Sequence, residues 1–316
     1  MNENSTLYWS ALSKYEECPQ EFLWSYGWDT IDLGRGLGKG KKTPEIKSKH
    51  HAIMGTVTQY AVEKLYNDEL YRDPKNLSKR LSDLIENEWA RQESKPYNPI
   101  DYTEARMSRE ELIQTCKDGA LGYLKTMKAH RLLGPYAKAE VPLLGWINKW
   151  TAIGGRADII LRREDTGVTI LDGKNTKHKM KYTDPDQVRW YALVFKLAYR
   201  ELPSRLGFIW YRFPYGMEGV AEDGEPFVEQ GVEWVPFTEE DLKGLAHRAV
   251  DARNGMRKEK FEATPKPPVC NFCDFESVCP ARQAQRQENS SKRTSNQNTL
   301  EEFETGRRGG FIDLLP

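Results

Sequence analysis

The segment from Gly154 to Lys174, GGRADIILRREDTGVTILDGK, constrains the fold of this chain more than any other feature. Two apolar runs, ADIIL and VTIL, flank a polar segment that ends in Asp-Thr-Gly, a favourable turn sequence, so we expect an antiparallel β-hairpin. Asp158 lies within the first run, and Asp172 directly follows the second. Because side chains alternate along a strand, Asp172 and Lys174 are expected on one face, with Asp158 near them on the partner strand.

These acidic positions need a partner, because burying an unpaired carboxylate is costly. Two carboxylates within reach of each other suit a divalent hard cation, which prefers oxygen ligands. The alternative is an ordinary ion pair between Asp172 and Lys174 at the end of a strand, with Asp158 capping a turn. On these three residues alone, both interpretations stay open.

The segments on either side of the hairpin add further polar side chains. Upstream, AEVPLLGWI is typical of a strand, and Glu140 at its start is a candidate third carboxylate. Downstream, Asp184 and Pro185 are typical of a helix N-terminus. Gln187 and Tyr191 follow with i, i+4 spacing, which places them on one face of that helix.

Length and composition limit the class of protein. The chain has 316 residues, 38% hydrophobic and 30% charged, enough for one large domain or two ordinary ones. No apolar run reaches the roughly 18 residues of a membrane span, and the N-terminus has no signal pattern, so we expect no membrane association and a cytoplasmic location. The net charge is zero, so nucleic acid would have to bind through local patches. Candidates follow the hairpin in KNTKHKMKY: Lys177, Lys179 and Lys181.

Three apolar stripes predict helices before the strands begin. Val57, Ala61 and Leu65 form the first, and a second begins at Leu77 and ends at Ile85. The third includes Cys116, which we expect to be a small buried apolar residue. The predicted organisation is an N-terminal segment (1–30), a helical region (31–135), an α/β core (136–262), a cysteine-rich segment (263–284) and a disordered tail (285–316).

Three of the five cysteines are close together in PPVCNFCDFESVCP: Cys270, Cys273 and Cys279. The total of five cysteines is odd and the N-terminus has no secretory signal, so we do not expect a disulfide framework. Such spacing indicates a metal centre that needs a fourth ligand, and Cys18, at a predicted Cys-Pro break in an N-terminal helix, is the natural candidate. A structural zinc ion is one possibility, although only one Cys-x-x-Cys pair is present.

The ordered series of acid, Asp-x-Lys and Gln-x-x-x-Tyr resembles the PD-(D/E)XK nuclease superfamily, and within it the RecB-like exonucleases. Asp158 matches the first acid, Asp172 and Lys174 match the (D/E)xK element, and Gln187 with Tyr191 match the Gln-x-x-x-Tyr motif. Upstream, GTVTQYAVE resembles the Gly-x-x-x-His-x-x-x-Glu helix of that family. Gly55 and Glu63 fit this motif, whereas Gln59 stands where the family usually has a metal-binding histidine.

The one-plus-three cysteine arrangement resembles the [4Fe–4S] clasp of AddB-type nucleases and of CRISPR-associated RecB-like exonucleases. This resemblance implies a restriction-endonuclease-like α/β core, with a mixed central sheet flanked by helices and an N-terminal helical part. It also implies a cluster held by four cysteines that joins the N- and C-terminal segments: Cys18, Cys270, Cys273 and Cys279.

The resemblance further implies metal-dependent hydrolysis of DNA phosphodiesters, with a preference for single-stranded ends. One or two Mg²⁺ or Mn²⁺ ions would be held by five groups: Asp158, Asp172, Glu140, the backbone carbonyl of Gly173 and, more weakly, Gln59. Lys174 would position or deprotonate the attacking water. Gln187 and Tyr191 would support the site and the substrate strand.

The tail and the missing histidine suggest two further interpretations. QNTLEEFE resembles a sliding-clamp-binding peptide, with Gln297, Leu300 and Phe303 matching and Glu304 failing the last aromatic position. A rival interpretation takes Gln59 as the mark of a catalytically weakened nuclease fold that is kept for binding DNA or for docking on a clamp.

Overall fold

The predicted hairpin lies at the centre of a six-stranded mixed sheet in a computed structural model of the chain. The structure describes residues 6–26, 48–95, 100–102, 105–176, 178–179, 183–221, 224–271, 273, 275–276 and 279–288. The chain divides into two units, one formed by residues 1–12 and 41–255 and the other by residues 13–40 and 256–316. Each unit is described by itself below.

In the larger unit, the sheet has the strand order β1-β5-β6-β7-β10, and β4 pairs with β5. Neighbouring strands are antiparallel except in the β1–β5 and β6–β7 pairs, which are parallel. The strands are β1 (Leu7–Tyr8), β4 (Ala137–Asn148), β5 (Thr151–Arg163), β6 (Gly167–Lys174), β7 (Arg205–Trp210) and β10 (Val232–Val235). The mixed sheet flanked by helices that the sequence predicted is therefore confirmed.

The β5–β6 hairpin turns where the sequence predicted it. Gly167, the last residue of Asp-Thr-Gly, has φ of 71°, a conformation that glycine adopts without steric cost. One boundary was predicted wrongly, because β4 begins at Ala137 and not near Glu140. The extra residues belong to the strand since Ala137 and Lys138 pair with Leu161 and Ile160 of β5.

The crossover from β6 to its parallel neighbour β7 is made by α7 (Pro185–Tyr199). Asp184 caps this helix, because its side chain accepts a hydrogen bond from the backbone N–H of Asp186. Helix α7 packs against β4, β5, β6 and β7, which positions its first turn beside the end of β6. The N-terminus predicted for this helix is confirmed.

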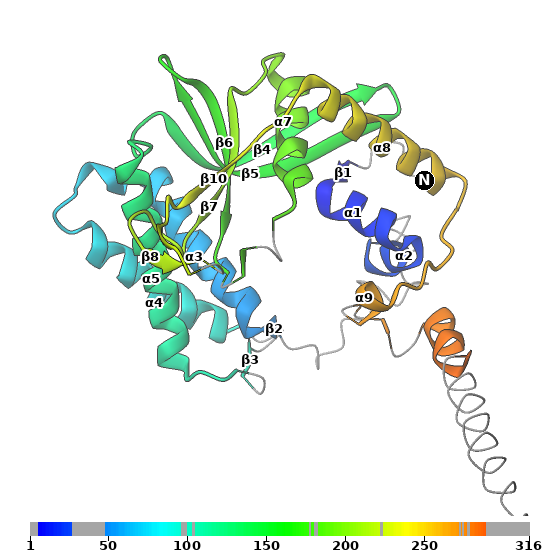
Figure 1. The fold of residues 1–316 in the computed structure, drawn as a ribbon, viewed down its shortest axis with the longest axis horizontal. Helices are drawn as coiled ribbons and strands as arrows, with labels where there is room; N and C mark the ends of the chain where they lie inside the picture. Colours follow the sequence, from blue (N-terminus) through cyan, green and yellow to red (C-terminus); the bar gives the residue numbers. More distant parts are fainter. Residues whose placement is uncertain are drawn as a thin grey trace, which may run out of the picture. The chain divides into compact units, whose positions relative to one another are not determined.

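Three longer helices, α3 (His50–Asn67), α4 (Leu77–Glu93) and α5 (Arg109–Ala129), pack on one another and are grouped together in Figure 1, away from α7. A capping box between Ser108 and Glu111 starts α5. The predicted apolar stripes form the core, with Val57 and Ile85 fully buried. Cys116 is fully buried as predicted, and burial raises the pKa of its thiol to about 11.

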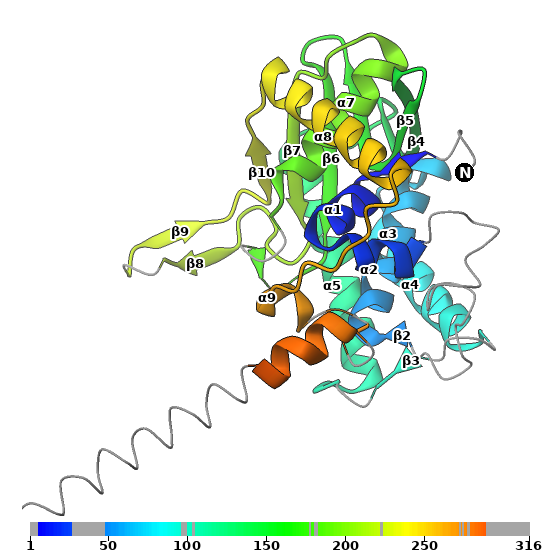
Figure 2. The same ribbon diagram turned by 90° about the vertical axis from the view of Figure 1, so that its right-hand side faces the viewer.

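The remaining elements of this unit are short, apart from α8 (Glu239–Arg257). Strands β8 (Glu218–Val220) and β9 (Pro226–Val228) form a hairpin that projects from the sheet in Figure 2. The others are β2 (Ser48–Lys49), β3 (Ile100–Asp101) and the 3-10 helix η3 (Leu70–Arg72). Among the described residues, no helix combines the length and the apolar character that crossing a membrane requires.

The smaller unit joins residues from both ends of the chain. It contains the end of α1 (Trp9–Glu17), α2 (Pro19–Tyr26), α9 (Pro267–Cys270) and a helical segment at 280–288. The rings of Phe22 and Phe261 stack with centroids 6.3 Å apart, and the hydroxyl of Tyr15 donates a 2.9 Å hydrogen bond to the carbonyl of Lys260. The predicted break at Cys18-Pro19 separates α1 from α2.

Candidate functional site

Three carboxylates occupy neighbouring positions on three adjacent strands of the larger unit. Glu140 of β4 lies between two register pairs, Ala139 with Ile159 and Val141 with Ala157, so it faces Asp158 of β5. On its other edge, β5 pairs with β6, and Ile159 is paired with Leu171. Continuing this antiparallel register by one residue places Asp158 opposite Asp172 of β6. The sheet therefore brings together the three acids that the sequence singled out.

Glu140 has an unusual backbone conformation for a strand residue. Its φ of 53° lies in the left-handed region, which is uncommon for residues other than glycine and costs free energy unless the surroundings enforce it. Two side chains hold its carboxylate: the amide of Gln59 donates a 2.8 Å hydrogen bond, and the guanidinium of Arg156 lies 3.7 Å away. This conformation interrupts the β4–β5 pairing at the position opposite Asp158.

Asp172, Lys174 and Gln187 form a closed triangle of polar contacts. The Gln187 side chain donates a 2.9 Å hydrogen bond to Asp172 Oδ1 and accepts a 2.8 Å bond from Lys174 Nζ. Lys174 Nζ also lies 2.7 Å from Asp172 Oδ2, an ion pair without good hydrogen-bond geometry. Since Asp172 is only 2% exposed, its Oδ2 is a buried oxygen with no hydrogen-bond donor among the described residues.

The surroundings of Asp158 and Asp172 disfavour two negative charges. Burial, the nearby charge of Asp172 and that of Glu140 raise the pKa of Asp158 well above its usual range, although the N–H of Gly173 donates a 2.8 Å hydrogen bond to it. Burial also raises the pKa of Asp172, and the charge of Lys174 offsets part of this effect. A proton or a bound cation therefore stabilises this group of acids.

Tyr211, which directly follows β7, was missed by sequence reasoning. Its hydroxyl donates a 2.6 Å hydrogen bond to Gln59 Oε1 and lies 2.0 Å from where a Cβ on Gly173 would be, so only glycine fits there. Gln59 thus bonds to Tyr211 through its oxygen and to Glu140 through its nitrogen. The one signal available was an aromatic residue at the end of a strand expected to be buried.

Two more residues complete the surroundings. The ring of Tyr191 packs where a Cβ on Gly155 would be, and burial, followed by the charges of Asp172 and Asp158, raises the pKa of its hydroxyl. Asn175 was also missed: its amide donates a 2.8 Å hydrogen bond to Thr58, and its buried Oδ1 has no hydrogen-bond partner among the described residues.

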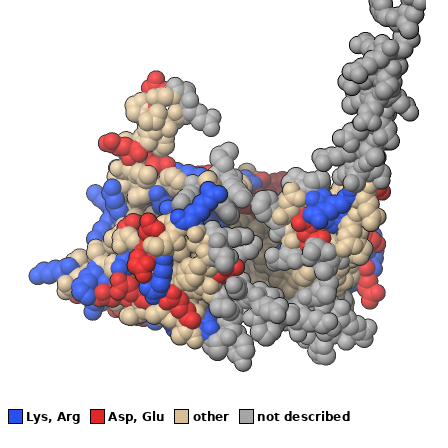
Figure 3. Space-filling model, turned by 90° about the horizontal axis from the view of Figure 1, so that it is seen from below, with Lys and Arg blue, Asp and Glu red and all other residues tan. Residues whose placement is uncertain are grey.

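The predicted basic residues after the hairpin are only partly described. Lys179 binds the carboxylate of Glu229 and lies over the ring of Phe213, so Glu229 already compensates its charge. Lys177 and Lys181 lie outside the described residues. Figure 3, which shows the face seen from below in the orientation of Figure 1, has Lys and Arg interspersed with Asp and Glu over its described surface.

A cavity of about 530 Å³ adjoins the row of acids. It runs beside β4, and its wall includes Glu140, the exposed Lys138 and, from the end of α3 and the following segment, Tyr66 and Tyr71. Tyr66 lies seven residues after Gln59 on α3, which corresponds to about 10 Å along the helix. Of the three acids, Glu140 lines this cavity, and it therefore has space next to it for part of a larger substrate.

The donor set in the larger unit fits a hard divalent cation in its chemistry. Mg²⁺ and Mn²⁺ prefer carboxylate and carbonyl oxygens, and the site offers three carboxylates, with a buried Asp172 Oδ2 that accepts no hydrogen bond among the described residues and is ion-paired with Lys174. No three side chains of His, Cys, Asp or Glu converge closely enough to hold a metal ion anywhere in the described part of the chain. The carbonyl oxygen of Gln59 already accepts the bond from Tyr211.

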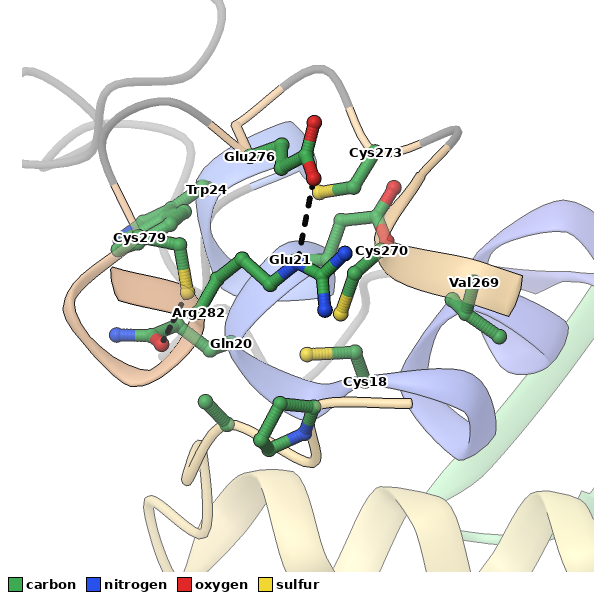
Figure 4. A pocket seen from close by; sticks show the side chains of 12 residues that line it. Cys18, Gln20, Glu21, Trp24, Val269, Cys270, Cys273, Glu276, Cys279 and Arg282 are labelled. Carbon is green, nitrogen blue, oxygen red and sulfur yellow. Dashed lines mark hydrogen bonds and ion pairs between the residues drawn. The ribbon is translucent and has the colours of Figure 1, made fainter. Parts of the chain in front are cut away.

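Four free cysteines line one narrow cavity of about 20 Å³ in the smaller unit (Figure 4). Cys18 comes from the α1–α2 junction, and the other three come from the C-terminal segment: Cys270, Cys273 and Cys279. Cys279 Sγ lies 3.9 Å from Gln20 Oε1, a contact across 259 residues of sequence. Burial and, secondarily, the charge of Glu21 raise the pKa of Cys273 to about 11. Four thiols in one cavity fit a four-cysteine metal centre in their chemistry.

Comparison with known proteins identifies one family. The family described as "PD-(D/E)XK nuclease superfamily" matches residues 8–280, most of the chain. No curated protein matches. Among solved structures, one titled "Crystal structure of SSO0001" is 16% identical, with 77% of this chain and 90% of that chain covered and a TM-score of 0.32, a likeness too weak to support an argument.

Proposed function

Because the chain belongs to the PD-(D/E)XK nuclease superfamily, we propose that it hydrolyses DNA phosphodiesters with Mg²⁺ or Mn²⁺, as an exonuclease on single-stranded ends. The observation that carries this proposal is the row of Glu140, Asp158 and Asp172 with Lys174 fixed beside it by Gln187. We also propose that the four cysteines hold a [4Fe–4S] cluster that links the two ends of the chain.

The oxygens in the row would bind the divalent cations. Asp158 and Asp172, assisted by Glu140 and the carbonyl of Gly173, would hold the ions, which supply a Lewis acid and an activated water when bound. Burial first, and then the charges of Asp172 and Glu140, raise the pKa of Asp158, and a cation beside these carboxylates would relieve their repulsion. The mutual repulsion of the acids thus supports the proposal.

Lys174 is the group best placed to act on the attacking water or on the charge of the transition state. Its Nζ contacts both Asp172 and Gln187, and these two contacts hold the otherwise flexible lysine side chain in one position. As an ammonium it would stabilise the developing charge on the phosphate, and as an amine it would accept a proton from water. In this proposal, Gln187 and Tyr191 support the site and the substrate strand and do not take part in the chemical step.

A single strand fits the space beside the acids better than a duplex does. The cavity along β4 is bounded by the half-buried ring of Tyr71, on which a base can stack, and by Lys138, which can contact a phosphate. A cavity of about 530 Å³ next to Glu140 has room for one nucleotide. This supports the preference for single-stranded ends.

The test is cleavage of single-stranded DNA labelled at the 5′ or the 3′ end, with Mn²⁺ and with Mg²⁺. Asp172→Asn and Lys174→Ala should each lower the rate at least about 100-fold. The matched control is Asp165→Asn, which changes an exposed aspartate in the turn of the same hairpin. Cleavage that persists in both site variants would refute the assignment, and the two labels reveal the direction of digestion.

One observation favours a second candidate function, a binding module with a weakened site. Gln59 stands at the position of the family's histidine, and its oxygen is already bonded to Tyr211. Single-stranded DNA that binds with Mn²⁺ but is not cut by the wild-type protein would support this alternative over the nuclease.

The cluster has its own test. Protein purified without oxygen should be brown and contain about four irons per chain, one for each cysteine ligand. Cys18→Ser should lose the colour, whereas Cys116→Ser, which changes a buried thiol outside the cavity, should keep it. Colourless wild-type protein with one zinc ion per chain would replace the cluster with a structural zinc site.

The proposed clamp-binding peptide, which includes Gln297, Leu300 and Phe303, lies outside the described residues. Its support is the sequence pattern alone, a short apolar segment in a polar tail. Removal of residues 289–316 should abolish binding to a sliding clamp in a direct titration and leave nuclease activity unchanged. A truncated chain that binds the clamp as tightly as the full chain would contradict this proposal.

A further inference from the structure

Arg282 is a buried arginine beside the four thiols. It is 8% exposed and lines the same cavity as the cysteines, and Figure 4 shows its guanidinium directed among them. Burying a charged group is costly unless hydrogen bonds and an opposite charge compensate it. The position of this arginine therefore needs an explanation in terms of what the cavity holds.

Three polar side chains fix the guanidinium. Asn271 accepts a 2.7 Å hydrogen bond, Gln285 a 2.6 Å bond and Glu276 a 3.2 Å bond. An arginine side chain carries five N–H donors. Among the described residues, these acceptors use three of them, and two N–H groups remain on a guanidinium that is already held in place.

The charges around the cavity make this arginine unusual. Of the twelve residues that line the cavity, all of them described, Glu21 and Glu276 are acidic and Arg282 alone is basic. A [4Fe–4S] core bound by four thiolates carries a net charge of about −2, which becomes about −3 after one-electron reduction. Lys14 binds Glu21 and Arg286 binds Glu276, but neither cation lines the cavity. Arg282 is therefore the one cation among the described residues of the cavity wall itself.

We propose that Arg282 is the counter-charge and hydrogen-bond donor of the cluster, and that it sets how firmly the cluster is held and how easily it accepts an electron. This inference rests on the proposed cluster. The reduction potential of an iron–sulfur centre depends on net charge and on hydrogen bonds to its sulfurs. Arg282 acts through the cluster and is therefore a positioning residue.

The chain offers a matched control. Arg286 lies one helical turn further on and donates to the same carboxylate of Glu276, but it is 59% exposed and does not line the cavity. Arg282→Gln and Arg286→Gln thus remove one positive charge each from the same helical segment, and only the first removes it from the cavity wall. Arg282→Lys keeps the charge and removes the planar set of donors.

The experiment uses full-length protein prepared without oxygen, with iron and sulfide content and far-ultraviolet circular dichroism measured first. The cluster is then titrated with dithionite, which supplies the one electron that converts the core from 2+ to 1+. In Arg282→Gln, the equilibrium constant for accepting this electron should fall about tenfold, a midpoint potential about 59 mV more negative. The rate of iron loss to a chelator should rise at least fivefold.

Arg286→Gln should match the wild type in both measurements, and Arg282→Lys should keep most of the potential but lose iron faster than the wild type. A wild-type cluster whose potential and iron loss are the same in Arg282→Gln overturns the inference and leaves the cluster itself established. Wild-type protein without iron overturns both. If Arg282→Gln does not fold, the rate of iron loss from Arg282→Lys decides, since without a bond from Arg282 to the cluster this rate would equal that of Arg286→Gln.

Discussion

Tyr211 donates its hydroxyl proton to the carbonyl oxygen of Gln59 at 2.6 Å, across 152 residues of sequence. The bond from Tyr211 fixes the side chain of Gln59, and the amide nitrogen of Gln59 in turn donates a hydrogen bond to Glu140, the first acid of the row. Here a glutamine that is bonded at both ends positions Glu140.

Gln59→Ala should destabilise the protein and weaken cation binding. It leaves the hydroxyl of Tyr211, which is 2% exposed, without its acceptor, so the free energy of unfolding should fall by about 1–3 kcal/mol. Glu140 loses a donor and its fixed position, so the dissociation constant for Mn²⁺ should rise. Urea denaturation and calorimetric titration measure the two effects.

Tyr211→Phe is the companion variant, because it removes the same hydrogen bond but leaves Gln59 attached to Glu140. Its free energy of unfolding should fall by about 1 kcal/mol, and Mn²⁺ should bind at least as tightly as in the wild type. Weaker Mn²⁺ binding in Tyr211→Phe than in Gln59→Ala would contradict this account of Gln59.

Gln187→Ala should slow cleavage about 10- to 100-fold without unfolding the protein. The Gln187 side chain bonds to both Asp172 and Lys174, and loss of such an orienting partner typically costs this much in activity or metal affinity. Rates on end-labelled single strands measure the loss. Gln114→Ala, which removes an exposed glutamine bonded to Asp118 away from the acids, is the control and should keep the wild-type rate.

Strand alternation predicted that Asp172 and Lys174 share a face with Asp158 near them, whereas the placement of Gln187 at this site came from the resemblance to the nuclease family. The role of Tyr211 could not be predicted, since its position depends on the parallel pairing of β6 with β7, which the crossover through α7 creates. The positive φ of Glu140 could not be predicted either, because sequence rules assign the left-handed conformation to glycine or asparagine and not to glutamate.

The helical stripes were predictable for the same reason as the acids, and Val57 and Leu65 are fully buried. The thiols were recognisable from cysteine spacing, whereas Arg282 carries no spacing signal and becomes visible only through its burial. Short-range periodicity is thus readable from the sequence, and contacts made by long-range pairing are not.

Gly122→Ala and Gly55→Ala should have opposite effects on stability. A Cβ on Gly122 of α5 would lie 2.2 Å from the backbone oxygen of Tyr211, so the helix and the strand end must separate. The free energy of unfolding should fall by about 1–3 kcal/mol, as in other overpacked cores. No described atom lies within 4 Å of a Cβ on Gly55, where alanine should add about 0.5–1 kcal/mol through helix propensity.

Thermal and urea unfolding of both variants check this prediction, and cleavage rates add a second readout. Gly122→Ala displaces the backbone next to Tyr211 and should lower activity with stability. If Gly55→Ala folds more stably but cuts more slowly, the open space at Gly55 is used by the substrate. A stable Gly122→Ala protein would contradict the close approach of α5 to Tyr211.

Glu93 should make stability fall steeply in acid. Its carboxylate accepts two hydrogen bonds from Arg109, 2.8 and 2.7 Å long, and others from Tyr102 and Trp89, which join the end of α4 to the start of α5. The bonds from Arg109, with burial opposing them, lower the pKa of Glu93 to about 2. A carboxyl with a lowered pKa contributes stability above its unfolded pKa and loses it as the pH falls through the folded value.

The window therefore extends from about pH 4.5 down to about pH 2. Glu93→Gln should be about 1–3 kcal/mol less stable than the wild type at pH 7, and the difference should shrink across this window because only the wild type loses the contribution. Urea unfolding at a series of pH values measures it. Glu86→Gln changes a carboxylate on α4 that is 58% exposed and should shift stability by less than about 0.5 kcal/mol. A difference between wild type and Glu93→Gln that stays constant from pH 7 to pH 2 would show that Glu93 acts through its shape and not through its charge.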